Sequence, residues 1–73
     1  MDNSLSSGAK FPRHPHEGAR VRHRDTGLIG LIVGQVVSRS EVLPGVLVTE
    51  VFVRPIGGGR EWTAVPDELE LLD

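Results

Sequence analysis

The stretch that most limits the possible folds is residues 18–37, GARVRHRDTGLIGLIVGQVV. A short basic segment, a turn and an apolar segment follow one another here without spacers. Asp25-Thr26-Gly27 is turn chemistry, because Asp can bond the backbone two residues on and Gly adopts a positive φ without steric cost. Gly30, inside the apolar run, indicates a bulge or a close approach of two backbones. The stretch therefore predicts two strands of a tightly curled sheet.

The first predicted strand covers residues 19–24 and alternates in character. Successive strand side chains point to opposite faces, so Arg20, Arg22 and Arg24 share one face and form a basic stripe. The second predicted strand covers about residues 31–37. Residues 38–45 then form a loop, which carries the apolar pair Val42-Leu43 without an obvious internal partner.

The clearest strand of the pattern is residues 46–54, which are rich in the strand formers Val, Thr and Phe. One face carries both charges of the segment, so we expect it to point outward and Phe52 to be partly exposed. The expected inward set is Leu47, Thr49, Val51 and Val53, and the expected outward set is Val46, Val48, Glu50, Phe52 and Arg54.

The last part of the chain predicts a hairpin and a single helical turn. Pro55 ends the third strand, and the glycines of residues 57–59 turn the chain into a fourth strand over residues 60–65. Residues 65–69 predict one helical turn, because Pro suits the first helical position and acidic residues suit a helix N-terminus. Residues 70–72 form a last strand. Five short strands predict an all-β fold, a small five-stranded barrel.

Two segments resemble known families. Gly27-Leu28-Ile29-Gly30-Leu31-Ile32, preceded by Gly18-x-x-Val21, resembles the strand-turn-strand of the KOW motif, found on SH3-like barrels of transcription-elongation and ribosomal proteins. KOW segments commonly carry lysines between the glycines, where this chain has Leu28 and Ile29. Residues 60–72, with a helical turn directly before the final strand, resemble the closing segment of SH3-like barrels. The resemblance implies a small bacterial SH3-like domain, with nucleic-acid binding as the family's activity.

Length and composition narrow the function classes. The 73 residues leave room for one domain, which we place at residues 17–73 behind a mobile tail of residues 1–16 rich in Ser, Asn, Gly and Pro. The absence of cysteine removes disulfides, thiol nucleophiles and Cys-based zinc sites. A barrel this small has little volume for a buried cleft, so we expect no enzymatic activity and no cofactor. No apolar run approaches a membrane span, and we expect a soluble, cytoplasmic protein.

Charge is distributed unevenly along the chain. The first 24 residues hold five basic side chains against two carboxylates, whereas residues 25–73 hold three arginines against eight carboxylates. The basic part could attract an anionic partner. It could equally be neutralised by the acidic C-terminal part of the same chain, and the sequence leaves both interpretations open.

The candidate sites follow from these patterns. For a non-enzymatic protein-interaction module, the leading hypothesis, the contact residues are Phe52, Val42, Leu43 and Trp62, although Trp62 could instead fill the core. The partner would be another protein or a second copy of the chain. For nucleic-acid binding, the alternative, the contacts are Arg20, Arg22, Arg24, Lys10 and Arg13. His14, His16 and His23 could bind a metal adventitiously, and we predict no specific metal site.

Overall fold

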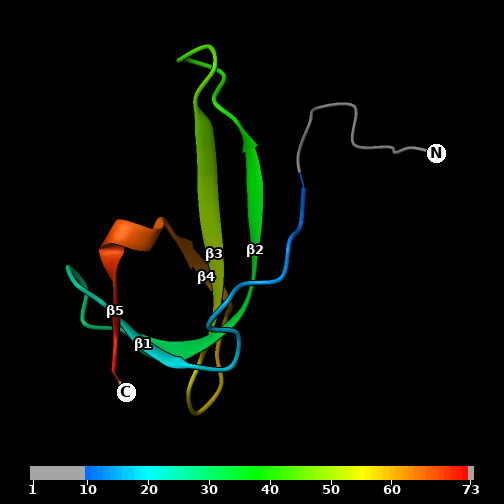
Figure 1. Cartoon of the computed structure of the whole chain (residues 1–73). Helices are drawn as coiled ribbons and strands as arrows, with labels where there is room; N and C mark the ends of the chain where they lie inside the picture. Colours follow the sequence, from blue (N-terminus) through cyan, green and yellow to red (C-terminus); the bar gives the residue numbers. More distant parts are fainter. Residues whose placement is uncertain (1–9, 73) are drawn as a thin grey trace.

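The computed structural model describes residues 10–72, which form one antiparallel sheet (Figure 1). In chain order the elements are β1 (Arg20–His23), β2 (Ile29–Arg39), β3 (Leu47–Pro55), β4 (Trp62–Ala64), the 3-10 turn η1 (Pro66–Glu68) and β5 (Leu69–Leu71). The strand order is β4-β3-β2-β1-β5. The five predicted strands and the helical turn before the last one are confirmed. The sheet is not closed, and β4 and β5 lie at its two edges.

The core lies on the inner face of this curled sheet. Val21, Ile32, Val51, Val53 and Ala64 are buried there, and Val51 and Val53 have no exposed surface. The side chains of Trp62 and Leu69 pack against this cluster from β4 and β5. No helix of the described residues is long and apolar enough to cross a membrane.

Gly30 allows β2 to pass close to β3, as the sequence predicts. A Cβ atom at this position would lie 2.5 Å from the Arg54 carbonyl oxygen and 2.5 Å from Val53 Cγ1. The register irregularity lies further along β2, between Ile32 and Gly34. A bulged strand bends more strongly, which is consistent with the curl of β2 in Figure 1.

The turn between β1 and β2 is where the sequence predicts it, but the side chain that accepts its backbone N–H groups is not Asp25. Gly27 has a φ of +78°. The Nδ1 atom of His23 accepts the N–H groups of Asp25 and Thr26, at 3.1 and 3.2 Å. The imidazole thus performs the role that we expected of the Asp25 carboxylate, because its half-buried ring is fixed beside Trp62 at the end of β1.

The inward assignment of β3 holds for Val51 and Val53 and is wrong for Leu47. Leu47 shares their face, but its side chain is 65% exposed. The reason is the length of the hairpin: β2 and β3 pair as far as Arg39 and Leu47, well beyond the point where β4 pairs with β3. In this far part of the hairpin the inner face of β3 has no core to pack against, so Leu47 is exposed.

Residues 10–13, part of the predicted tail, lie against β2. Lys10 and Val37 exchange backbone hydrogen bonds of 2.7 and 2.8 Å. The Gln35 side-chain amide donates to the Arg13 carbonyl oxygen at 3.3 Å. Residues 1–9 of that tail are outside the described residues.

Candidate functional site

The far part of the β2–β3 hairpin, residues 35–50, projects away from the rest of the sheet (Figure 1), and we call it the arm. Its tip is ordered by local hydrogen bonds. The Ser40 hydroxyl accepts the N–H groups of Val42 and Leu43, at 3.1 and 3.0 Å, and the Ser40 N–H donates to the Val46 carbonyl. Gly45, at a φ of +81°, completes the turn. The tip therefore holds Val42 (83% exposed) and Leu43 in solvent in a defined conformation.

Phe52 and Trp62, the two aromatic candidates, lie on opposite faces of the sheet. Phe52 is half-buried on the outer face, opposite Gly34 and Thr63 on the neighbouring strands. Its partial exposure is as predicted. Trp62 packs on the core, so the core-filling interpretation describes its position. Its Nε1 atom is buried without a hydrogen-bond partner in the described part of the chain. The four predicted contact residues thus do not form one surface, and only Val42 and Leu43 adjoin.

The basic first strand meets the acidic C-terminal part of the chain. The Arg22 guanidinium donates to Glu70 Oε1 at 2.7 Å, and the Arg24 Nε atom donates to the Asp67 carbonyl at 3.0 Å. Between the backbones, Arg24 N–H donates to the Glu68 carbonyl. The tail residue Arg13 pairs with Glu17 at 3.2 Å. Of the two interpretations of the charge asymmetry, intramolecular neutralisation accounts for Arg22, whereas Arg24 bonds to a neutral backbone carbonyl.

The Arg22–Glu70 pair makes stability depend on pH. The hydrogen bond from Arg22, and then its charge, lower the pKa of Glu70 from 4.5. A carboxyl group with a lowered folded-state pKa contributes stability above its unfolded pKa and loses that contribution as pH falls through the folded value. We expect Glu70→Gln to unfold more easily than the wild type at pH 7, and the difference to shrink below pH 4.5 and vanish in stronger acid. Urea titrations at a series of pH values measure this. Arg22→Gln is the matched control and should lose the same pH-dependent contribution to stability. A stability difference between the wild type and Glu70→Gln that persists at low pH would contradict a role of the Arg22–Glu70 pair.

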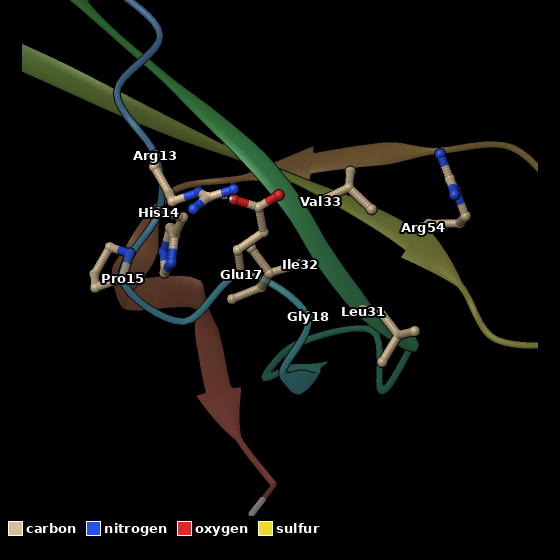
Figure 2. A pocket seen from close by; sticks show the side chains of 9 residues that line it. All are labelled: Arg13, His14, Pro15, Glu17, Gly18, Leu31, Ile32, Val33 and Arg54. Carbon is tan, nitrogen blue, oxygen red and sulfur yellow. Dashed lines mark ion pairs between the residues drawn. The ribbon is translucent and has the colours of Figure 1, made fainter.

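Two hollows flank residues 13–18. The larger, of about 690 Å³, is open and lies between this segment and the outer side of β2 (Figure 2), where Arg13 and Glu17 point toward one another. The smaller, of about 320 Å³, is more apolar and lies over the inner face. His14 borders both hollows; burial, and then the neighbouring His16, lower its pKa from 6.5.

The histidines do not gather into one site. The rings of His14 and His16 have centroids 6.0 Å apart, whereas His23 lies against Trp62. Within residues 10–72, no group of three or more His, Cys, Asp or Glu side chains is placed to hold a metal ion.

The geometry thus offers an exposed apolar arm, an internally paired basic strand and two shallow hollows on a small all-β domain. Compared with known proteins, the chain matches no family model, no curated protein and no solved structure.

Proposed function

We propose that this chain is a non-enzymatic protein-interaction module on a small SH3-like barrel, and that the arm is its contact surface. The SH3-like assignment is supported by five antiparallel strands with the turn η1 directly before β5. The KOW-like resemblance of residues 18–37 fits the same architecture.

The observation that carries the proposal is the apolar surface of the arm. In residues 10–72 only four large aliphatic side chains are buried, whereas twelve large apolar side chains are exposed. Five of those twelve belong to the arm: Val42, Leu43, Val46, Leu47 and Val48. Leu47 lies on one face of the arm, and Val46 and Val48 lie on the other. Single exposed apolar residues are common, but several on one projecting element favour an interaction site. The arm adds little to the core, so its apolar character is explained best by a partner.

Nucleic-acid binding through Arg20, Arg22, Arg24, Lys10 and Arg13 stays a prediction. Arg22 and Arg24 already bond to the C-terminal part of the chain. A phosphate would have to compete with these bonds, and the arm has no such internal competitor among the described residues.

The test is a double substitution at the tip, Val42→Ser with Leu43→Ser. We expect the melting temperature to change by less than ~3 °C, because neither side chain contacts the core. In affinity purification from the native host, the wild type should recover a stoichiometric protein that the variant loses. Nuclease treatment should leave this recovery unchanged.

The matched control is Leu28→Ser, which replaces an exposed leucine in the β1–β2 turn, away from the arm. It should recover the same protein as the wild type. Equal recovery by the tip variant, or loss of the protein on nuclease treatment, would refute the proposal.

A further inference from the structure

The arm has two edges, and their backbone groups are used differently. On the β2 edge, Val37 exchanges both of its backbone hydrogen bonds with Lys10. In an antiparallel pair, two residues opposite each other point their backbone N–H and C=O groups either both toward the partner strand or both away from it. Thr49 lies opposite Val37, so its N–H and C=O point out of the other edge. Leu47, two residues away on the same strand, points the same way.

On the side facing away from β2, neither Leu47 nor Thr49 has a strand beside it within residues 10–72. The neighbouring strand β4 pairs with β3 only at Val51, Phe52 and Val53. An open hollow of about 340 Å³ lies beside the bare edge, bordered by residues 47–49 of β3 and residues 65–67 around η1. Within residues 10–72 this edge therefore has unpaired backbone groups and apolar side chains beside an open hollow.

We propose that this edge pairs with the same edge of a second copy of the chain, antiparallel, with the two-fold axis at Val48. The inference rests on the proposed function, since it names a partner for the arm. In this register Leu47 lies opposite Thr49 of the second copy, so the outward-pointing groups of both residues face each other. Val48 then lies beside Val48 of the second copy on the outer face. Such a contact is isologous and closes at two chains.

The length and charge of the segment favour a second copy as the occupant. The added strand cannot continue past Glu50, because the next residue, Val51, is already paired with Ala64. At its other end it must turn away at Gly45, which has a φ of +81°. The available edge is thus residues 46–50, and this window is complementary to itself. Glu50 falls opposite Val46 of the second copy, so no like charges meet across the strands.

The other sheet edges offer less. The edge strands β4 and β5 have three residues each. Thr63 is the middle residue of β4, between Trp62 and Ala64, whose side chains are both directed at the core. Because Thr63 lies on an edge strand that the proposed pairing does not use, it serves as the control position.

Sedimentation equilibrium of the full chain tests the proposal. Because the window is short, we expect a weak dimer, with the average mass rising from the monomer value of 7.9 kDa between ~10 μM and ~1 mM protein. Thr49→Pro removes an outward N–H that the β2–β3 ladder does not use, and should weaken association at least ~10-fold. Thr63→Pro should associate like the wild type.

Substitutions that introduce a charge at Val48, on the two-fold axis, provide a second test that does not depend on the proline variants folding. Val48→Lys and Val48→Glu each place like charges side by side across the two-fold axis, and each should weaken association at least ~10-fold. An equimolar mixture should restore it as a heterodimer. A wild type that remains monomeric at ~1 mM, a mixture that does not associate, or loss with Thr63→Pro instead of Thr49→Pro would overturn the proposal.

This outcome is separable from that of the proposed function. A monomeric wild type whose tip variant still loses a different cellular protein would overturn self-pairing alone. A dimeric wild type whose tip variant keeps every recovered protein would overturn the tip contact alone.

Discussion

Gly30→Ala is expected to destabilise the domain by ~3 kcal/mol or more, because the new methyl group has no space. It would lie 2.5 Å from the Arg54 carbonyl oxygen and from Val53 Cγ1. One of these atoms is backbone, so relief requires β2 and β3 to move apart at the centre of the sheet. A loss of this size lowers the melting temperature by ~15 °C in a domain of this length. Thermal and urea unfolding measure it.

Gly34→Ala is the matched control on the same strand. Its methyl group would meet only Phe52 Cδ2, at 4.0 Å, which is an ordinary contact. Alanine also loses less conformational entropy on folding than glycine, so we expect a change within ~0.5 kcal/mol or a small gain. Similar losses at both positions would show that the close approach at Gly30 is not what constrains the strand.

Val53→Ala is expected to cost ~2.5 kcal/mol, from lost burial and from the cavity that remains. Val53 has no exposed surface and, within residues 10–72, belongs to a cluster of only four large buried side chains, so the neighbours have few ways to fill the gap. A domain of this size has only ~5 kcal/mol of stability to lose. Urea unfolding with the slope unchanged is the measurement.

Val42→Ala makes the same chemical change at the tip of the arm. Val42 is 83% exposed, so we expect a change within ~0.5 kcal/mol. A large loss at Val42 would place the tip in a packed interface, and a small loss at Val53 would contradict its place in the core.

The sequence predicts only part of the apolar surface of the arm. Val42 and Leu43 stand out as apolar residues in a polar loop. Leu47 does not, because its spacing from Val51 and Val53 is that of a core residue, and only the reach of the hairpin beyond β4 exposes it. The available signal was the apolar run of residues 28–37, which is interrupted at Gln35 but is longer than the predicted strands at residues 19–24 and 60–65.

The sequence by itself determined the local features: the strands, the turns and the close approach at Gly30. These depend on neighbouring residues, since alternation, glycine and proline act within a few positions of the chain. The tertiary structure alone decided that Arg22 pairs with Glu70, that Lys10 covers one edge of the arm and that no strand within residues 10–72 covers the other edge. These features join residues far apart in the chain, and a two-residue period specifies which face a side chain takes but not which strand lies beside it.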